Sequence, residues 1–350
     1  MISTLSYLSL IPTAGFCYQY FATRRDGKNY PPPGDMIDVG GYKLHIQCQG
    51  EARPGIPTVI VETGIWDCSQ SWQVVQSELA PTSRICTYDR AGYGWSEKGL
   101  CPRTFEQMVR DLRILLDKKG VHPPFVFVGH SLGGAIVRYY QSQYPDDVVG
   151  IIFVDAVHKE APAFSSIFRV VSKAFSFLAH FGMLRLIFKL CPPLSANPKW
   201  TPTMQKTYVA CHQAKISTFT TCFDEWDGYE VSFKSLREKA RSLKDIPVTL
   251  ISRDPEHSLR PGMSKEARKK EREELEKMHQ QQLEDSPHAR FVVAKESSHV
   301  VQIDRPDVVI EEIQRMVDQI TNPLGKLKPP IIKLNSCDKN TPWPNVGGNL

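Results

Sequence analysis

The most informative segment of the chain is Phe125-Val-Phe-Val-Gly129-His130-Ser131-Leu132-Gly133-Gly134. It begins with an apolar run that is typical of a buried strand, and the residues from Leu132 to Tyr144 follow with the pattern of a helix. A Gly-x-Ser-x-Gly motif between a strand and a helix predicts a nucleophile elbow, a tight turn that projects the serine hydroxyl above a sheet edge. Gly129 and Gly133 remove side chains that would collide in this turn. The alternative is a serine that caps a helix in an ordinary glycine-rich loop.

Strand and helix patterns alternate on both sides of this stretch. Short apolar runs predict strands at Pro57–Glu62, Ser83–Tyr88 and Val149–Val154. A hairpin that turns at Gly40-Gly41 is predicted to precede them. A capping-box pattern at Thr104–Gln107 opens a helix that Gly120 ends. The apolar face of this helix repeats at 3.6-residue spacing: Phe105, Met108, Val109, Leu112 and Leu116. The order predicts an α/β fold with a mostly parallel central sheet and helices on both faces.

The alternation stops at residue 158 and resumes with the strand pattern Ile246–Ile251. Residues 158–244 contain no clear buried strand, so we predict a helical insertion after the sixth strand, between two core segments, 35–157 and 245–322. The second segment continues with a strand at Phe291–Ala294 and closes with a helix that starts near Pro306. Residues 265–277 alternate Lys or Arg with Glu and predict a solvated helix with ion pairs Glu266–Lys270 and Glu273–Lys277.

The two ends of the chain differ from the core in composition. Residues 1–23 carry no charge, and Arg24, Arg25 and Lys28 follow them. We therefore expect residues 1–34 to be an apolar leader and linker, with membrane attachment through residues 1–23 and the catalytic domain in the cytosol. The alternative is a leader docked on a soluble intracellular domain. The Pro-, Asn- and Gly-rich residues 323–350 predict a disordered tail.

The composition excludes several classes of protein. The 350 residues are 41% hydrophobic and 23% charged, which argues against a mostly disordered or fibrous chain. The 43 Lys and Arg against 38 Asp and Glu give a net charge of only +5, which argues against a nucleic-acid binder. Nine cysteines without a Cys-x-x-Cys pair disfavour a disulfide scaffold and a zinc site. We expect no metal and no organic cofactor.

A nucleophilic serine needs a base and an orienting carboxylate. His299 is the candidate base, because it follows the predicted strand Phe291–Ala294, whose end reaches the same sheet edge as Ser131. His130 should point away from the nucleophile. Two carboxylates qualify as the acid: Asp155 directly follows the strand Val149–Val154, and Asp254 lies just beyond Ile246–Ile251. Strand-end geometry favours Asp155 as the acid, and Asp254 remains the alternative.

The oxyanion of an acyl-transfer intermediate needs backbone donors. One is expected from the N–H of Leu132, directly after the nucleophile. The other is expected from the loop Thr63-Gly64-Ile65-Trp66, where the N–H of Ile65 is our choice. Glu62 and Asp67 flank this loop, and we expect structural roles for both, with Asp67 capping a helix.

These motifs make the chain resemble α/β-hydrolase fold proteins of the cap-bearing, single-domain type. The resemblance spans roughly residues 35–322 and rests on the elbow, on Asp89–Ser96, on Ser298-His299 and on the order Ser131, acid, His299. Three departures stand out: Thr63 replaces the common histidine of the oxyanion loop, Ser298 replaces the common glycine, and the Asp254 turn lacks its usual glycine. Some dehalogenases of the fold carry the acid after the sixth strand, as Asp155 does. Epoxide hydrolases and dehalogenases use an aspartate nucleophile, so Ser131 argues against both activities.

The function implied is a serine hydrolase that cleaves a carboxylic ester through an acyl-enzyme. The insertion would form a cap over Ser131, and its Phe, Leu and Ile content favours a hydrophobic acyl substrate. The same residues would serve equally to pack the cap on the core. The basic, apolar stretch Ile167–Leu190 is a further candidate for membrane contact. The alternatives are an acyltransferase that uses the same site and a non-catalytic binding protein that retains the fold.

Overall fold

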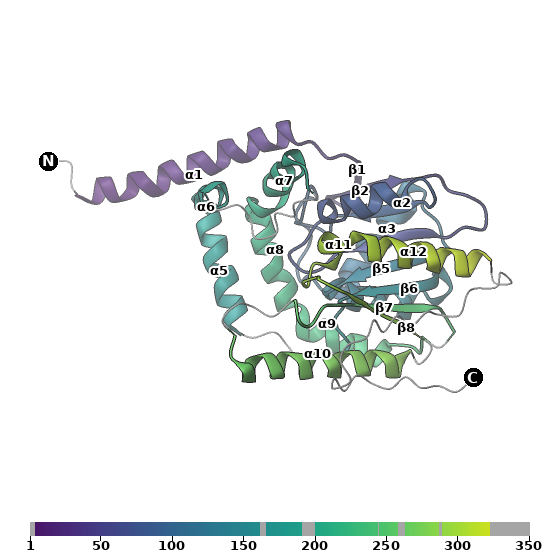
Figure 1. Cartoon of the computed structure of the whole chain (residues 1–350). Helices are drawn as coiled ribbons and strands as arrows, with labels where there is room; N and C mark the ends of the chain where they lie inside the picture. Colours follow the sequence, from purple (N-terminus) through teal and green to yellow (C-terminus); the bar gives the residue numbers. More distant parts are fainter. Residues whose placement is uncertain are drawn as a thin grey trace.

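The computed structural model describes residues 4–161, 166–190, 200–243, 245–257, 263–286 and 289–322. Within them, eight strands form one sheet in the order β1-β2-β4-β3-β5-β6-β7-β8 (Figure 1). The strands are β1 (Asp35–Asp38), β2 (Lys43–Gln49), β3 (Thr58–Glu62), β4 (Ile85–Tyr88), β5 (Phe125–His130), β6 (Val148–Val154), β7 (Val248–Arg253) and β8 (Arg290–Ala294). β2 pairs antiparallel with β1 and β4, and the remaining pairs are parallel. The predicted α/β-hydrolase sheet is confirmed.

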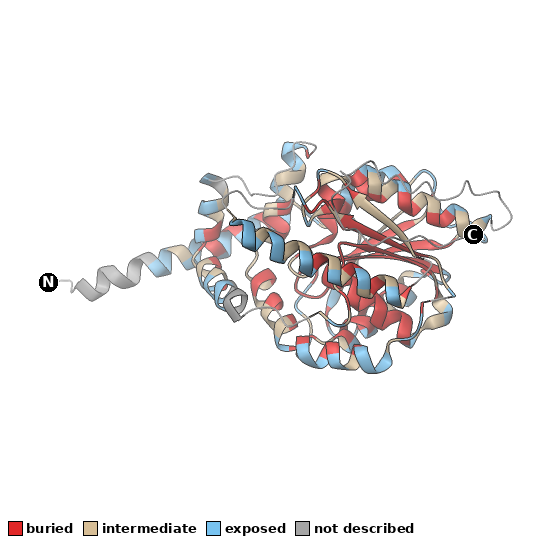
Figure 2. Ribbon diagram, turned by 60° about the horizontal axis from the view of Figure 1, so that its bottom comes forward, coloured by how far each residue is buried: buried red, intermediate tan, exposed pale blue. Residues whose placement is uncertain are grey.

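Helices cover both faces of the sheet, and its central strands are buried, whereas β1 and β8 at the two edges are partly exposed (Figure 2). One face packs against α3 (Phe105–Lys119) and α4 (Leu132–Gln143), and the other against α2 (Gln73–Leu79) and α12 (Pro306–Thr321). Strand β5 shows the alternation that this requires, since Phe125 and Phe127 face the first layer and Val126 and Val128 face the second. The remaining core elements are η1 (Ser69–Trp72), η2 (Pro145–Asp147), α10 (Lys265–Asp285) and α11 (Val301–Asp304).

The helical insertion lies between β6 and β7. It contains α5 (Ser166–His180), α6 (Met183–Leu190), α7 (Pro202–Tyr208), η3 (Val209–Gln213), α8 (Ile216–Asp227) and α9 (Tyr229–Lys239). In Figure 1, α5, α6, α7 and α8 stand together beside the sheet. Helix α9 packs differently, because its buried Tyr229, Phe233 and Leu236 join the core layer of α3 and α4. The outlying part of the insertion therefore ends before α9.

The N-terminal segment is helix α1 (Thr4–Asn29), which lies across the insertion in Figure 1. Gln19, Ala22 and Asp26 are buried on one face of α1. Among the described residues, none of the helices combines the length and the apolarity that crossing a bilayer requires. The predicted tail, residues 323–350, lies outside the described residues.

Local predictions are met with some differences. Thr104 Oγ1 accepts a bond from Gln107 N, as in a capping box, but the Gln107 side chain turns to Tyr42 and Asp111 instead of returning to the cap. In α10 the ion pairs at i,i+4 spacing are Lys269–Glu273 and Lys270–Glu274, so Lys270 and Glu273 pair on the opposite side from the predicted partners Glu266 and Lys277.

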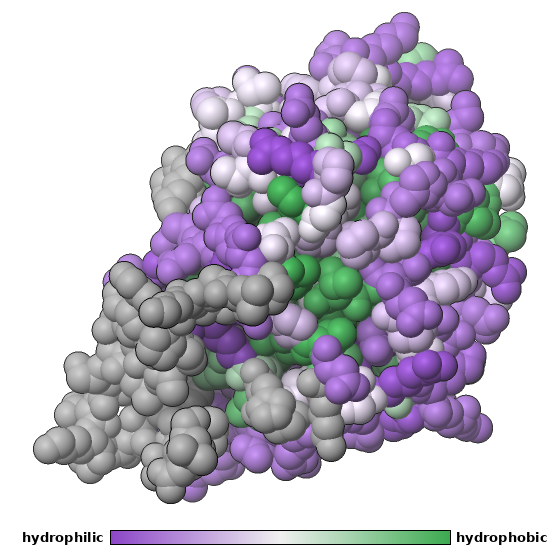
Figure 3. All heavy atoms as spheres, turned by 90° about the vertical axis from the view of Figure 1, so that its right-hand side faces the viewer, coloured by the Kyte–Doolittle hydropathy of each residue, from purple (hydrophilic) through white to green (hydrophobic). Residues whose placement is uncertain are grey.

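Two further features of the core and surface were not predicted. A disulfide joins Cys48 of β2 to its register partner Cys86 of β4. Seen from the side away from α5, the surface is mostly hydrophilic, with a hydrophobic area near its centre (Figure 3).

Candidate active site

Ser131 occupies the sharp turn between β5 and α4. Its φ of 52° and ψ of −122° lie outside the regions that side chains other than glycine prefer. Hydrogen bonds to the end of β6 and to the residues that follow it hold this backbone: Ser131 N donates to Val154 O at 3.1 Å, and Val157 N donates to Ser131 O at 3.1 Å. Backbone strain of this kind persists only where the surrounding structure imposes it, and it gathers at functional sites.

The glycines of the motif allow this turn because other backbone passes very close to them. A Cβ atom at Gly129 would lie 2.7 Å from Gly134 Cα, and one at Gly133 would lie 2.3 Å from Glu62 O. The end of β3 therefore packs directly on the start of α4. This contact brings the loop that follows β3 next to Ser131, since a Cβ at Gly64 would lie 3.2 Å from Ser131 Cβ.

Positive φ angles outline the same region. Among the described residues, the non-glycine residues with positive φ are Trp66, Ser131, Asp155 and Glu296. Each lies just beyond the carboxyl end of a parallel strand, after β3, β5, β6 and β8 respectively. Four strained residues at one sheet edge mark this edge as the candidate active site.

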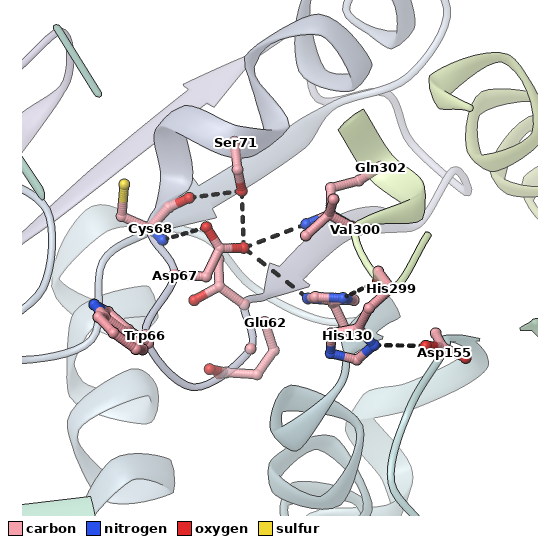
Figure 4. Close-up of polar contacts among 12 residues, drawn as sticks. Glu62, Trp66, Asp67, Cys68, Ser71, His130, Asp155, His299, Val300 and Gln302 are labelled. Atoms are coloured by element: carbon pink, nitrogen blue, oxygen red, sulfur yellow. Dashed lines mark hydrogen bonds and ion pairs between the residues drawn. The ribbon is translucent and has the colours of Figure 1, made fainter. Parts of the chain in front are cut away.

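His299 lies after β8 and bonds to Asp155, which lies after β6. The distance from His299 Nδ1 to Asp155 Oδ2 is 2.5 Å (Figure 4). The Asp155 side chain is 1% exposed, whereas the His299 side chain is 45% exposed. The carboxylate is thus fixed in the protein, whereas the imidazole that it holds is partly exposed.

Asp254, the alternative acid, binds the backbone of the histidine loop. Its Oδ2 accepts from Glu296 N at 3.0 Å, and its own N–H donates to Ser297 O at 3.2 Å. Ser298, which stands where the family commonly has glycine, donates from both N and Oγ to Asp304 Oδ2, at 2.8 and 2.6 Å. These contacts hold the loop that carries His299.

Arg253 is a second partner of Asp155 that sequence reasoning missed. Its Nη1 donates to Asp155 Oδ2 at 3.0 Å, and its Nη2 lies 3.3 Å from Glu271 Oε1 on α10. Burial alone would raise the pKa of Asp155, but the hydrogen bond from His299 and the charges of His299 and Arg253 hold that pKa well below its usual range. The available signal was its position: Arg253 is the last residue of β7, the strand beside β6.

His130 is buried behind His299. The two rings lie 4.8 Å apart between centroids, and His130 Nε2 is 2.8 Å from His299 O (Figure 4). Because a carbonyl oxygen only accepts, Nε2 carries the proton of His130. Burial, with the neighbouring His299, lowers the pKa of His130 to about 3, so this ring is neutral at ordinary pH. His130 therefore supports the His299 loop.

A buried arginine fixes the loop after β3. Arg90 donates to Thr63 O at 2.6 Å and to Gly64 O at 2.9 Å, while Glu62 and Glu225 neutralise its charge at 2.8 Å each. Because Arg90 binds both carbonyls, it fixes the orientation of the backbone just before Ile65. The loop Asp89–Ser96 thus contributes to the site through this guanidinium.

Asp67 anchors the other end of the same loop. It accepts from Cys68 N at 2.8 Å, from Ser71 Oγ at 2.9 Å and from Gln302 Nε2 at 3.3 Å (Figure 4). The N-cap of η1 is Cys68, so Asp67 satisfies the cap residue's own N–H instead of being the cap. Burial raises the pKa of Asp67 to about 6. The contact with Gln302 ties the loop after β3 to the helix that follows His299.

The oxyanion candidates flank Ser131. Leu132 is the first residue of α4, where helix geometry leaves the N–H without a partner inside the helix. Ile65 follows Gly64, and the next residue, Trp66, packs on Phe175 and Phe219 of the insertion at 6.0 and 5.4 Å between ring centroids. The insertion thus supplies aromatic surface beside the loop.

Comparisons with known proteins agree with this fold. The family model described as "alpha/beta hydrolase fold" matches residues 57–306. An "AB hydrolase superfamily protein" from Gibberella zeae is 29% identical over 298 residues, which cover 79% of this chain and 91% of that protein.

Solved structures share the fold at low identity. The Cif epoxide hydrolase from Acinetobacter nosocomialis superposes with a TM-score of 0.64 at 13% identity, covering 86% of this chain and 96% of that one. A thermophilic esterase from Thermogutta terrifontis gives a TM-score of 0.55 at 18% identity, covering 82% and 97%. At such identities the likeness shows the fold alone.

Proposed function

The chain belongs to the α/β-hydrolase fold family, and within that family we propose that it is a serine hydrolase that cleaves carboxylic esters. The observation that carries the proposal is the set of side chains at one sheet edge: Ser131 on its strained turn, and His299 bonded to Asp155 at the ends of β8 and β6. These are the nucleophile, base and acid of a Ser-His-Asp triad in the order that the fold requires.

The proposed reaction has two halves. His299 Nε2 removes the proton from Ser131 as Oγ attacks the ester carbonyl, and it then protonates the departing alcohol oxygen. Water, activated by the same imidazole, cleaves the acyl-enzyme and regenerates Ser131. Asp155, which is buried and ionised, holds Nδ1 in its protonated form and stabilises the imidazolium that forms in each half.

The developing oxyanion is held by the N–H groups of Leu132 and Ile65. The N-terminus of α4 supplies partial positive charge there. The contacts of Arg90 with Thr63 O and Gly64 O keep the second donor in place before substrate arrives, which is the condition for electrostatic stabilisation of the transition state.

An aromatic and aliphatic environment supports a hydrophobic acyl substrate. Trp66 packs with Phe175, Leu178, Phe188 and Ile216 of the insertion, in a cluster next to the oxyanion loop. We assign the insertion, residues 158–244 without α9, as the cap over the candidate site. Membrane contact through residues 1–23 and the cap also belongs to the proposal.

The identity of the elbow residue separates this proposal from epoxide opening, the reaction named for the Acinetobacter structure. A serine alkoxide forms an acyl ester that water cleaves readily. A fluorophosphonate probe tests the proposal, since it modifies an activated serine. We expect labelling of the native chain and none of Ser131→Ala.

The same experiment addresses two alternatives. Folded chain that resists the probe would favour a non-catalytic binding protein. If labelling succeeds, turnover of a p-nitrophenyl ester with and without added alcohol distinguishes hydrolysis, which yields the free acid, from acyl transfer, which yields a new ester. A series of acyl chain lengths then defines the substrate.

A further inference from the structure

Helix α1 is attached to the rest of the molecule through polar groups. Gln19 Nε2 donates to Ala214 O at 2.9 Å, and Arg185 of α6 donates to Gln19 Oε1 at 2.8 Å and to Asp26. Gly15 completes this face, where a Cβ would lie 2.7 Å from Phe181 O. The residues 15, 19, 22 and 26 recur at helical spacing, so one side of α1 is committed to the insertion.

The aromatic side chains of α1 point the other way. Phe16 is 55% exposed and Phe21 is 67% exposed, and Tyr20 beside them carries the guanidinium of Arg24 at 4.6 Å from its ring centroid. This arrangement inverts the usual one for a helix on a water-soluble domain, in which apolar residues face inward.

Helix α6 also exposes apolar residues, although its inward face is apolar as well. Leu184 and Phe188 pack inward with Trp66 and Phe219, and Arg185 reaches α1. Among the residues of α6 whose burial is described, the exposed ones recur at i, i+3, i+4 and i+7 and are apolar: Met183, Leu186, Ile187 and Leu190. Leu190 is 71% exposed. An entirely apolar stripe in water is unfavourable unless something covers it.

Helix α5 adds a third stripe. Val170 and Phe177 are exposed, and Phe177 stacks edge-on with Phe181 at the turn into α6. Of the thirteen large hydrophobic side chains that are exposed in the described part of the chain, eleven lie on α1, α5 and α6. These helices touch one another, so we call their outward faces the α1–α5–α6 surface.

The charges on these helices have one sign where they are exposed. The acidic residue of the three helices is Asp26, which is buried against Arg185. Arg24, Arg25, Lys28 and Lys173 are exposed cations beside the apolar side chains. Tyrosine, arginine and lysine next to an apolar face are the composition of a surface that lies in a membrane interface.

We propose that the α1–α5–α6 surface docks on an anionic lipid bilayer, with α1 and α6 lying in the plane of the interface. The apolar stripes would enter the acyl boundary, and the cations would meet lipid phosphates. A second copy of the chain fits the surface less well, because a two-fold contact would bring the cations of both copies together without acidic partners.

The surface is connected to the site through α5. Phe177 faces outward, whereas Phe175 on the same helix packs on Trp66, next to Ile65. An ester that leaves the bilayer would therefore meet apolar side chains of α5 both at the surface and beside the loop that carries Ile65. This part of the inference rests on the proposed function and names the substrate class as a membrane-resident ester.

Vesicle flotation of the full chain tests the docking. We expect co-flotation with phosphatidylcholine vesicles that contain phosphatidylglycerol and weaker binding without it. The triple variant Phe21→Ser, Leu186→Ser, Leu190→Ser should lose about tenfold or more in vesicle affinity, because three exposed apolar side chains leave the interface. Arg24→Glu with Lys28→Glu should lose the preference for anionic lipid.

Two matched controls come from the remaining exposed hydrophobic residues. Val231→Ser and Leu100→Ser remove side chains of similar exposure outside the surface, so vesicle binding should not change. Equal loss in these controls, or native binding by the triple variant, would overturn the proposal. The proposal would also be overturned if the native chain formed a dimer in the absence of lipid and the triple variant were a monomer.

The link to catalysis has its own measurement. Ser131→Ala should float like the native chain, because binding does not depend on the nucleophile. The triple variant should hydrolyse a soluble short-chain ester at the native rate and a vesicle-embedded ester more slowly. Native flotation with no hydrolysis of either ester would contradict the proposed function while leaving the docking surface intact. Equal loss on both esters would contradict the substrate assignment.

Discussion

The Nδ1 atom of His299 lies 2.5 Å from Oδ2 of Asp155, so the imidazole that follows β8 is paired with the carboxylate that follows β6. The carboxylate after β7, Asp254, is instead bonded to the backbone of the histidine loop. This difference assigns distinct roles to two aspartates that the sequence places at one edge of the sheet.

Exchanging each aspartate for asparagine should separate these roles. Asp155→Asn should lower kcat by about 10³- to 10⁴-fold, because an amide neither stabilises the imidazolium nor holds the reactive tautomer. Asp254→Asn keeps a hydrogen-bond acceptor for Glu296 N and should retain kcat within about tenfold. Steady-state kinetics on one ester measures both, and a larger loss for Asp254→Asn would show that Asp155 is not the acid.

Arg253 should support catalysis through Asp155. It donates to Asp155 Oδ2 at 3.0 Å, and its charge helps to hold the pKa of this carboxylate well below its usual range. In Arg253→Gln we expect kcat/KM to fall by roughly tenfold, because a charge-assisted hydrogen bond that orients the carboxylate is lost. Arg253→Lys preserves the charge and should recover most of the native value. Unchanged steady-state kinetics in Arg253→Gln would limit this residue to packing.

The space at Gly64 should matter for catalysis more than for folding. A Cβ there would lie 2.9 Å from His130 Nδ1 and 3.2 Å from Ser131 Cβ. Gly64→Ala should lower kcat/KM by about 100-fold by displacing these side chains, with a small change in Tm. Gly27→Ala in α1 is the control and should have native activity, because a Cβ added at Gly27 would have no neighbouring atom within 4 Å. Native activity in Gly64→Ala would mean that this loop does not contact the reacting groups.

Acid should destabilise the fold through its buried histidines. Burial lowers the pKa of His130 to about 3 and the pKa values of His212 and His279 to about 4. Unfolding raises each of these values toward about 6.5, so the unfolded chain binds more protons below that pH. The free energy of unfolding should therefore fall as the pH drops from about 6.5 to about 4, by about 1.4 kcal/mol per unit for each histidine.

Asp67 opposes this trend between about pH 4 and 6, because its raised pKa gives the folded state the extra proton. Urea unfolding across this range measures the balance. His279 of α10 packs on Phe291 of β8, at 5.0 Å between ring centroids, so His279→Leu removes one titrating group and keeps an apolar contact. In this variant the free energy of unfolding should change with pH less steeply, by about 1.4 kcal/mol per pH unit. An identical slope would show that His279 does not titrate on unfolding.

The sequence was most informative where local chemistry determines structure. Gly129, Ser131 and Gly133 predict the elbow because only such residues permit the turn. Apolar runs predict the central strands, because buried parallel strands require them. The position of Asp155 at a strand end sufficed to favour it over Asp254.

Long-range polar contacts could not be predicted in this way. Arg90 reaches Glu225 across 135 residues, and Gln302 reaches Asp67 across 235. No local pattern encodes such partners. The sequence of the apolar leader also could not predict which face of α1 is buried, since the burial of Gln19 and the exposure of Phe21 depend on how α1 packs against α6. Periodicity identifies the faces of a helix but not which of them the protein covers.

In the proposed reaction Ser131 carries the acyl group during turnover. Mass spectrometry of the chain quenched during hydrolysis of a p-nitrophenyl ester measures this directly. We expect a mass increase of one acyl group on the peptide that contains Ser131, and we expect Ser131→Ala to lose both this increase and turnover. An acyl group on another residue, or undiminished turnover by Ser131→Ala, would show that Ser131 is not the nucleophile.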